Sequence, residues 1–386
     1  MNNFEFYCPT KIIFGKGTIA KLPELIDKSN KVLITYGGGS IKRNGVYDQV
    51  KKALEGYNVI EFGGIEPNPK YETLMKAVEI VKNEGVDFLL AVGGGSTLDG
   101  TKFIAAASKY YGDKDAYDYF MVEQNPVLEA VPLADVIILP ATGSEMNSGG
   151  VISRISTDEK LAFGGVPLYP KFSIIDPQVT FTLPLRQTVN GIVDTFVHVM
   201  EQYCTYDVNS PLQDDWALGI LRTLIKEAPK VIANPEDYDA RANIFWCATC
   251  GLNYWISLGV PQDWATHMIG HELTAFYGID HGQSLAIVEP RLLRNQKVSK
   301  AKKLAKLARE VFCVNEPVDL KAADIAIDKI EAFFNSIGMK TKLSDYEIDS
   351  NEAAEKIRER FAQRHTVLGE KGAINTDTAY DIVKAS

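Results

Sequence analysis

Four of the five histidines in this 386-residue chain fall in two short segments. The segment "THMIGHELTAFYGIDHG" contains His267, His271 and His281, and "VDTFVHVMEQY" contains Asp194 and His198. Imidazole and carboxylate groups together suit a metal ion of borderline softness. If the fold brings the two segments together, they can hold a divalent metal ion.

The spacing within each segment supports this hypothesis. Asp194 and His198 are four residues apart in an apolar helical pattern, and His267 and His271 repeat that spacing. Residues four apart lie on the same face of a helix, whereas His281 follows in a glycine-flanked turn. The predicted ligands are therefore Asp194, His198, His267 and either His271 or His281. The remaining histidine lies beside the metal, where it can relay a proton.

These residues allow two other interpretations. A carboxylate in an apolar helix needs a partner, so Asp194 could serve only as a cap or in a salt bridge. The metalloprotease pattern H-E-x-x-H is absent, because no histidine stands three positions after Glu272. The inverted pattern H-x-x-E-H also fails, since Gly270 occupies its glutamate position. A hydrolase of that kind is disfavoured.

A second kind of chemistry is indicated by "LLAVGGGSTLDGTKF", which reads as a strand, a glycine-rich turn and a helix that begins near Ser96. Such a helix N-terminus presents amide groups and a positive dipole end to an anion, which suits a pyrophosphate. The alternative is an ordinary strand-to-helix turn. Two standard fingerprints fail: Thr101 replaces the P-loop lysine, and Leu98 replaces the last glycine of G-x-G-x-x-G. The phosphate hypothesis therefore depends on the turns that follow the neighbouring strands.

Two such turns are present in the sequence. In "VLITYGGGSIKR", glycines 37–39 and Ser40 follow a strand without any carboxylate, and Lys42 and Arg43 come next. Since an acidic residue at this place would repel a 2′-phosphate, the sequence predicts NADP(H) over NAD(H). A plain loop is the alternative. In "LPATGSEMNSGG", Thr142 and its neighbours offer further donors after a third strand.

The elements around these motifs divide the chain into two kinds of structure. Up to about residue 180, short apolar strands such as "KVLITY", "DFLLAV" and "FSII" alternate with amphipathic helices, which predicts βαβ units and a mainly parallel sheet. Beyond "TLPLRQ" the patterns are helical. We therefore expect an α/β dinucleotide-binding domain over residues 1–183 and an all-helical metal-binding and substrate domain over 184–386.

Composition narrows the classes of function. The formal net charge is −9, which disfavours a nucleic-acid binder, because phosphate backbones are bound by basic surfaces. No apolar stretch is long enough to span a membrane, and the N-terminus lacks a secretory signal pattern. Five scattered cysteines fit a cytoplasmic protein with reduced thiols. The C-x-x-C pattern at Cys247 and Cys250 indicates two small apolar side chains that pack in a buried helix.

The motifs "AVGGGSTLDGTK", "LPATGSE", "VDTFVHVMEQY" and "HMIGHELTAFYGIDHG" resemble those of the iron-containing (group III) alcohol dehydrogenases, over essentially the whole chain. The stretches "ITYGGGS", "FGGIEPNP" and "GVPQDWATH" are similar to the bacterial branch of NADPH-dependent aldehyde reductases and butanol dehydrogenases. This resemblance implies the dehydroquinate synthase-like fold, a homodimer, and one Fe²⁺ or Zn²⁺ ion bound by the same ligand types.

The resemblance also assigns residues. It implies that Asp194, His198, His267 and His281 bind the metal, and that His271 and Asp99 take part in catalysis. The cofactor contacts it implies are Gly38, Ser40, Asn68, Gly94, Gly95, Ser96, Asp99, Thr142, Asn147 and Lys160. The chain departs from the family pattern at "PATGSE", where many members have "TTAGTGSE".

The expected reaction is reversible hydride transfer between NADP(H) and a small aldehyde or primary alcohol such as butyraldehyde or butanol. The metal would act as a Lewis acid, and Trp264 or Phe276 would line the substrate pocket. Two alternatives are a lyase on the same fold, which needs a basic pocket for an acidic substrate, and a nucleotide-binding sensor in which the metal is structural. No basic cluster flanks the histidines, and this disfavours the lyase.

Overall fold

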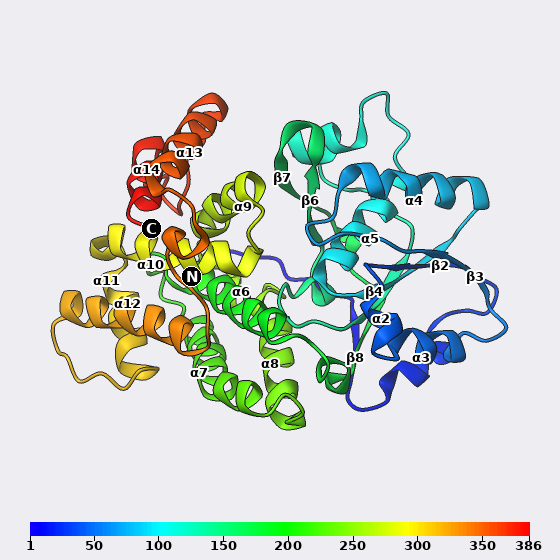
Figure 1. The fold of residues 1–386 in the computed structure, drawn as a ribbon, viewed down its shortest axis with the longest axis horizontal. Coiled ribbons are helices and arrows are strands. Elements are labelled where there is room, and N and C mark those ends of the chain that lie inside the picture. The colour runs from blue at the N-terminus through cyan, green and yellow to red at the C-terminus, as the bar shows by residue number, and fades with distance from the viewer. The chain divides into compact units, whose positions relative to one another are not determined.

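The computed structural model describes all residues from Met1 to Ser386. The chain forms two compact units (Figure 1). The sheet unit comprises Tyr7–Pro184 and Pro235–Thr249, and the helical unit comprises Met1–Phe6, Leu185–Asn234 and Cys250–Ser386. The predicted boundary between residues 183 and 184 falls beside the break at Pro184. The sequence patterns do not reveal that residues 1–6 and 235–249 belong to the opposite unit.

The sheet unit is built on six parallel strands in the order β1-β8-β5-β4-β2-β3. These strands are β1 (Lys11–Phe14), β2 (Lys31–Tyr36), β3 (Asn58–Phe62), β4 (Phe88–Gly93), β5 (Leu133–Ile137) and β8 (Phe172–Ile175). The central strands β4 and β5 are buried at every position. Continuous burial explains why the sequence of β4 is an uninterrupted apolar run instead of an alternating pattern. In β5 the apolar run is interrupted by Asp135, whose buried carboxylate accepts a hydrogen bond from Ser173 Oγ at 2.6 Å.

Helices cover both faces of this sheet. They are α1 (Leu22–Leu25), α2 (Ser40–Arg43), α3 (Val46–Ala53), α4 (Tyr71–Glu84) and α5 (Gly95–Ser108). Alternate residues of one strand face different cores: Leu89 packs with residues of α4 and α5, whereas Leu90 packs with residues of α2 and α3. The expected doubly covered parallel sheet is therefore present.

The strand order contains a reversal that matters for ligand binding. The chain passes from β2 to β3 on one side and then returns to form β4 on the other side of β2. In such sheets, ligands bind at the carboxyl ends of the strands where the order reverses. The turns after β2 and β4, which contain Gly38 and Gly94, lie at this point.

A small antiparallel hairpin accompanies the main sheet. It consists of β6 (Gly149–Arg154) and β7 (Glu159–Gly164), which the sequence patterns do not reveal. Short helical turns complete the unit: η1 (Thr18–Lys21), η2 (Asp118–Val122), η3 (Ser144–Met146), η4 (Ile155–Thr157), η5 (Val166–Leu168) and η6 (Pro177–Thr180).

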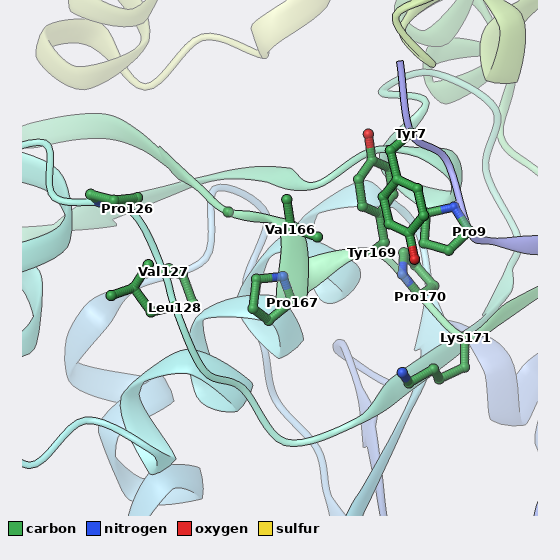
Figure 2. A pocket seen from close by; sticks show the side chains of 11 residues that line it. Tyr7, Pro9, Pro126, Val127, Leu128, Val166, Pro167, Tyr169, Pro170 and Lys171 are labelled. Carbon is green, nitrogen blue, oxygen red and sulfur yellow. The ribbon is translucent and has the colours of Figure 1, made fainter. Parts of the chain in front are cut away.

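An apolar pocket of about 560 Å³ lies at the amino ends of the parallel strands, and Figure 2 shows the residues that line it. Its wall includes Tyr7 and Tyr169, whose rings meet edge to face at 6.3 Å between centroids. Pro9, Val127 and Lys171, which also line it, precede strands β1, β5 and β8. The pocket therefore lies at the amino ends of the strands, away from the glycine-rich turns.

The helical unit contains the remaining long helices. They are α6 (Leu185–Tyr203), α7 (Pro211–Ala233), α9 (Ala265–Tyr277), α10 (His281–Asn295), α11 (Lys297–Glu310), α12 (Asp319–Ser336), α13 (Ser350–Arg364) and α14 (Thr376–Lys384), with short turns η7 (Trp255–Ser257) and η8 (Leu343–Tyr346). Helix α8 (Tyr238–Gly251) belongs almost wholly to the sheet unit. No helix has the length and apolar character needed to cross a bilayer.

The predicted helices occur close to their expected positions, with one correction that concerns the site. The glycine-flanked pattern predicts His281 in a turn, but it is the first residue of α10. Asp280 caps this helix in a capping box with Gln283, so the glycine-flanked stretch begins a helix instead of forming a loop. The cysteine pair 247 and 250 lies in α8, and all five cysteines are free thiols.

Candidate functional site

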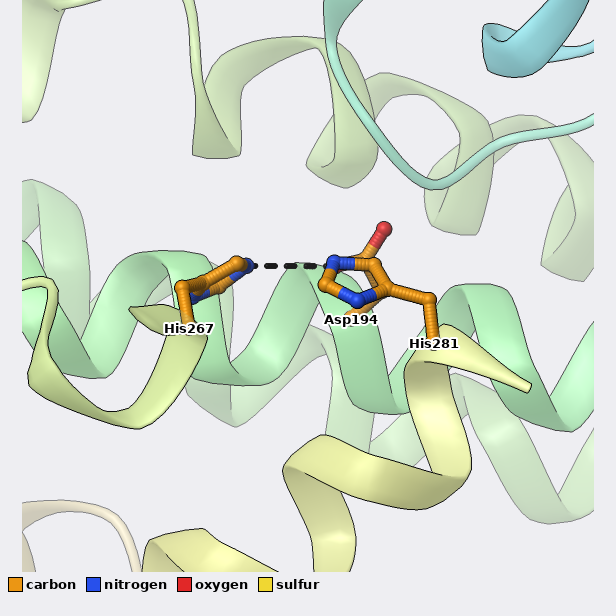
Figure 3. Close-up of side chains that lie close together, drawn as sticks. All are labelled: Asp194, His267 and His281. Atoms are coloured by element: carbon orange, nitrogen blue, oxygen red, sulfur yellow. Dashed lines mark ion pairs between the residues drawn. The ribbon is translucent and has the colours of Figure 1, made fainter. Parts of the chain in front are cut away.

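The predicted ligands converge on one carboxylate oxygen. Asp194 lies in the middle of α6, and its Oδ1 atom is 3.5 Å from Nδ1 of His198, 3.5 Å from Nε2 of His267 and 3.5 Å from Nε2 of His281. These histidines come from α6, α9 and α10. Figure 3 shows that His267 and His281 approach Asp194 from two separate helices.

The separations fit a tetrahedral metal site. Ligand atoms bound at about 2.0–2.2 Å to a tetrahedral ion lie roughly 3.3–3.6 Å apart. Ligand atoms of Asp194, His267 and His281 all lie within 4.8 Å of one another. His198 meets Asp194 but is outside this mutual group, and its ring stacks on that of His267 at 4.5 Å between centroids. The structure thus assembles three of the four predicted ligands as a cluster, with the fourth beside them.

The electrostatics of the cluster also favour a cation. Burial alone would lower the pKa of His267, but the carboxylates of Glu201 and Asp194 raise it to about 9. Its Nε2 atom, which faces Asp194, has no hydrogen-bond partner. The site therefore stabilises a positive charge at the place where a metal ion would sit, and its nitrogen and oxygen donors suit iron or zinc.

Helix α9 places His267 through contacts at its first turn. The amide of Ala265 donates to Asp263 Oδ1 at 3.0 Å, and the amides of Thr266 and His267 donate to Glu201 Oε1 at 2.6 and 3.2 Å. The second oxygen of Glu201 pairs with Nδ1 of His267. Glu201 is absent from the predicted site residues, although it follows Asp194 by seven positions on the same helix.

Helix α10 places His281 through contacts with α6. The Asp280 carboxylate accepts hydrogen bonds from Arg186 Nε and Asn190 Nδ2, both at 2.6 Å. A β-carbon at Gly282 would come within 2.7 Å of the carbonyl oxygen of Asn190. Because the backbone of α10 touches that of α6 here, the glycine allows His281 to reach Asp194.

His271 lies next to the cluster without joining it. Its ring centroid is 5.2 Å from that of His281 and 6.1 Å from that of His267, and the residue is buried. The structure therefore separates the two histidines that sequence spacing leaves as alternatives. His281 stands with Asp194, and His271 lies beside the cluster, so its predicted role toward the substrate stays a prediction.

The two aromatic candidates for the pocket wall have different surroundings. Trp264 meets the rings of His198 and His267 at 6.1 and 5.4 Å between centroids. Phe276 instead packs in the cluster around α13 and α14, with the Arg360 guanidinium 4.1 Å from its ring centroid. Of these two aromatic residues, only Trp264 meets the rings of predicted metal ligands.

Glu272, which follows His271 in the sequence, has a structural role. Its carboxylate accepts hydrogen bonds from Arg360 at 2.9 Å and from Arg364 at 2.8 Å, which ties α9 to α13. Burial raises the pKa of this carboxyl group, and the two guanidinium groups oppose that change. Since Glu272 points at arginines, it offers no general base to the metal site.

In the sheet unit, the glycine-rich turn after β4 leads directly into α5. The N-cap residue of α5 is Gly94, so no side chain caps this helix. A β-carbon on Gly95 would lie 2.4 Å from Thr142 Oγ1, and one on Gly94 would lie 3.3 Å from Leu139 Cβ. The glycines thus let the third predicted turn, with Thr142, close onto the N-terminus of α5 beside Ser96.

The turn after β2 carries positive charge. Lys42 lies 4.9 Å from the ring centroid of Tyr36 and 4.8 Å from that of Tyr47. The carboxylate of Glu61 on β3, whose charge acts on Lys42, accepts a hydrogen bond from Tyr47 at 2.9 Å. Gly38 has open space around its α-carbon, and Ser40 begins α2.

Asn68 and Lys160 lie outside these two turns. Asn68 precedes α4 with a φ angle of 55°, in the left-handed region that asparagine tolerates better than most residues. Lys160 is half-buried on β7, and its charge helps to lower the pKa of Asp99 against the larger raising effect of burial. Their predicted contacts with the cofactor stay predictions.

Asp99 and Asn147 participate in a buried network centred on Lys102. The ammonium group of Lys102 donates to Ser144 Oγ at 2.8 Å and to Asn147 Oδ1 at 3.0 Å, and it also reaches the backbone carbonyls of Ser144, Asn147 and Gly149. Asp99 accepts from Ser144 Oγ at 2.7 Å and from the Val151 amide at 3.0 Å. The network holds the loop after β5 against α5.

The network is sensitive to charge because it is buried. Burial lowers the pKa of Lys102 to about 8, although Asp99, Asp135 and Glu145 oppose this change. Burial raises the pKa of Asp99, Asp135 and Glu145. The hydrogen bonds give Asp99 and Asn147 a role in holding the loop, and their predicted catalytic or cofactor contacts stay predictions.

Family comparisons agree with this architecture. The family model described as "Iron-containing alcohol dehydrogenase" matches residues 9–177, and the model described as "Fe-containing alcohol dehydrogenase family, C-terminal" matches residues 188–386. The chain belongs to the iron-containing alcohol dehydrogenase family. The predicted family resemblance and the predicted fold class are therefore confirmed. As a member of this family, the chain is an oxidoreductase.

Individual relatives cover the whole chain. The NADPH-dependent aldehyde reductase YqhD of Escherichia coli is 50% identical over 386 residues, with 100% of both chains covered. The probable NADH-dependent butanol dehydrogenase 1 of Bacillus subtilis is 44% identical, again with 100% of both chains covered. The crystal structure of Escherichia coli YqhD has a TM-score of 0.97 over 100% of this chain and 98% of that chain, at 50% identity.

Proposed function

We propose that this family member catalyses reversible hydride transfer between NADP(H) and a small aldehyde or primary alcohol, such as butyraldehyde or butanol. It would use one divalent ion, Fe²⁺ or Zn²⁺. The observation that carries the proposal is the approach of three imidazoles to Asp194 Oδ1, each at 3.5 Å. We also propose a cytoplasmic homodimer as its working form, on the resemblance to this family.

The metal ligands proposed are Asp194, His198, His267 and His281. Bound there, the ion would supply Lewis-acid chemistry, polarising a carbonyl and stabilising the charge that develops on its oxygen. The protein's own part is to fix the donors: Asp194 is buried in α6, His267 is fixed by Glu201, and α10 is tied to α6 through Asp280.

The cofactor residues proposed are Gly38, Ser40, Asn68, Gly94, Gly95, Ser96, Asp99, Thr142, Asn147 and Lys160. The uncapped N-terminus of α5 at Gly94 and Gly95 suits the pyrophosphate of a dinucleotide, which would supply or accept the hydride. The names of the relatives divide between NADPH and NADH. The absence of a carboxylate in the turn after β2, with Lys42 close by, supports NADP(H) here.

His271 is the residue proposed to move a proton. It is buried beside His281, with 5.2 Å between ring centroids, and it lies outside the ligand cluster. During aldehyde reduction it would give a proton to the substrate oxygen, directly or through a water molecule, and take it back in the reverse direction. Trp264, which packs against His198 and His267, would exclude bulk water from the reacting group.

An initial-rate comparison tests the proposal. Protein of assayed metal content is given butyraldehyde and a panel of other aldehydes with NADPH or NADH. We expect oxidation of the nicotinamide that depends on aldehyde and a higher kcat/KM with NADPH. No turnover of any aldehyde by metal-loaded protein would favour the lyase or sensor alternatives.

Replacing a ligand tests the metal directly. His267→Ala is expected to lose metal retention and turnover together, because it removes one ligand from a buried site. Glu272→Gln is the matched control, since Glu272 lies on the same helix and its carboxylate accepts hydrogen bonds from Arg360 and Arg364. Full activity in metal-free His267→Ala would overturn the proposed role of the cluster.

A further inference from the structure

Glu201 occupies a position between two of the helices that supply the cluster. It lies on α6, three residues after His198, and its side chain reaches the first turn of α9. The residue is 4% exposed. The hydrogen bonds of its carboxylate are made to residues 266 and 267, far away in the sequence.

The two oxygens of this carboxylate have different partners. Oε1 accepts from the backbone amides of Thr266 and His267 at 2.6 and 3.2 Å, so it caps the N-terminus of α9. Oε2 pairs with the imidazole Nδ1 of His267. One side chain therefore sets both the direction of the helix and the orientation of the ring.

The second contact has a consequence for the other ring nitrogen. A carboxylate only accepts hydrogen bonds, so Nδ1 of His267 must carry the proton in the neutral imidazole. Nε2 is then the atom with a free lone pair, and it is the atom that faces Asp194 at 3.5 Å. Carboxylates that hold the far nitrogen of a ligating histidine raise its basicity and fix its tautomer.

We infer that Glu201 is a positioning residue that selects the metal-binding tautomer of His267 while it caps α9. This inference rests on the proposed function, since it needs a metal ion at His267. Glu201 is not one of the clustered residues Asp194, His267 and His281, and in this proposal it acts through the imidazole of His267.

Glu201→Gln separates the two roles of the carboxylate. The amide oxygen of glutamine must stay at the Oε1 position, because two backbone amides donate there. The NH₂ group then faces Nδ1 of His267 and donates to it. A neutral His267 must now carry its proton on Nε2, the atom that should bind the metal, so the cap is kept while the tautomer is inverted.

The experiment measures Zn²⁺ affinity and Zn²⁺ release to a chromophoric chelator for the metal-loaded protein. We expect Glu201→Gln to bind Zn²⁺ about 10–100-fold more weakly than wild type, while circular dichroism of the metal-free variant shows the helical content of wild type. Glu289→Gln is the matched control. Its carboxylate accepts from Thr266 Oγ1 at 2.6 Å but has no contact with an imidazole, so its Zn²⁺ affinity should stay at the wild-type value.

The outcomes separate the two hypotheses. If wild type holds neither Zn²⁺ nor Fe²⁺ at this cluster, the proposed function fails. If wild type holds Zn²⁺ and Glu201→Gln holds it equally well, Glu201 is only a helix cap and the inference is overturned. Should Glu201→Gln fail to fold, ¹⁵N NMR of His267 in metal-loaded wild type decides, because a proton on Nδ1 supports the inference and a bare Nδ1 contradicts it.

Discussion

At Gly38, a proposed cofactor contact, we expect an added charge to change the choice between the two nicotinamide cofactors. A β-carbon added at this position would meet no atom within 4 Å, and the φ angle of Gly38 is outside the left-handed range. Gly38→Asp should therefore fit without strain and bring a carboxylate to the end of β2. Because the carboxylate repels a 2′-phosphate, the ratio of kcat/KM for NADPH to that for NADH should fall by about tenfold or more, about 1.4 kcal/mol.

The control for this change is Gly38→Asn, which has nearly the same shape without the charge. Initial rates with both cofactors should leave its preference close to that of wild type. Equal losses with NADPH and NADH in Gly38→Asp would contradict the charge argument and point to a steric effect.

Glu289 is a buried acid whose protonation should affect stability. Burial and the nearby Glu201 carboxylate raise its pKa from 4.5 to about 8. Between these values the folded protein holds a proton that the unfolded chain releases, so this group makes stability fall as pH rises from about 5 to 8. Where Glu289 is almost fully protonated in the folded protein and almost fully ionised in the unfolded chain, the free energy of unfolding falls by about 1.4 kcal/mol per pH unit.

Glu289→Gln should remove this pH dependence, because the amide stays neutral and its oxygen can still accept from Thr266. Urea unfolding of the metal-free proteins at several pH values checks it. The variant should gain stability relative to wild type between pH 5 and 8 and match it most closely at the acid end. Parallel curves for the two proteins would count against a raised pKa.

At the scale of single residues, sequence spacing predicts only contacts between residues that are close together in the sequence. The pairs Asp194 with His198 and His267 with His271 are found because residues four apart share a helix face. The choice of His281 over His271 depends on Asp280 and Asn190, which meet across ninety positions of sequence. Glu201 escapes prediction for the same reason, since its partners are the first amides of a helix more than sixty positions away.

At the scale of elements, the close contact between α6 and α10 is the one that brings His281 to Asp194. Gly282→Ala would place a β-carbon 2.7 Å from the Asn190 carbonyl oxygen and 2.8 Å from its α-carbon. Both atoms are backbone, so α10 must move away from α6. We expect a destabilisation of about 1–3 kcal/mol and faster Zn²⁺ release, measured by denaturation and chelator competition.

Gly219→Ala is the matched control for this change. Gly219 lies within α7, where an added β-carbon meets nothing within 4 Å. Alanine favours a helix interior, so this variant should be more stable by about 0.5–1 kcal/mol with unchanged Zn²⁺ release. If Gly282→Ala also proves stabilising, the two helices are not in the contact described.

The elements themselves are largely predictable, and the exceptions have physical reasons. A buried parallel strand such as β4 is a continuous apolar run, so it stands out in sequence. The hairpin of β6 and β7 escapes prediction because it is half-buried and rich in glycine and polar residues, without a clear alternation. The start of α10 resembles a turn because Gly278 and Gly282 flank it, although Gly278 ends α9 and Asp280 caps α10.

At the scale of the whole molecule, the two kinds of predicted chemistry belong to different units. The proposed metal ligands all lie in the helical unit, and the glycine-rich turns all lie in the sheet unit. Sequence patterns locate the division near Pro184, because the alternation of strands and helices stops there. They cannot assign residues 235–249, whose helix α8 looks like its helical neighbours but packs Phe245 into the core of the sheet unit.

This division predicts that the metal and the cofactor stabilise different parts of the chain. A ligand stabilises the structure that it binds, by about 2.7 kcal/mol at a concentration one hundred times its Kd. Zn²⁺ should therefore slow hydrogen exchange in α6, α9 and α10, whereas NADPH should slow it around β2, β4 and α5. Exchange of wild type alone, with Zn²⁺ and with NADPH, measured by mass spectrometry, gives both patterns.

His267→Ala provides the internal control for this last prediction, because it lacks one metal ligand but keeps the whole sheet unit. Its exchange should no longer respond to Zn²⁺, while the response to NADPH should persist. Protection of β4 and α5 by Zn²⁺ alone would place the metal in the wrong unit. Loss of the NADPH response in His267→Ala would show instead that cofactor binding in the sheet unit depends on the helices that carry the metal ligands.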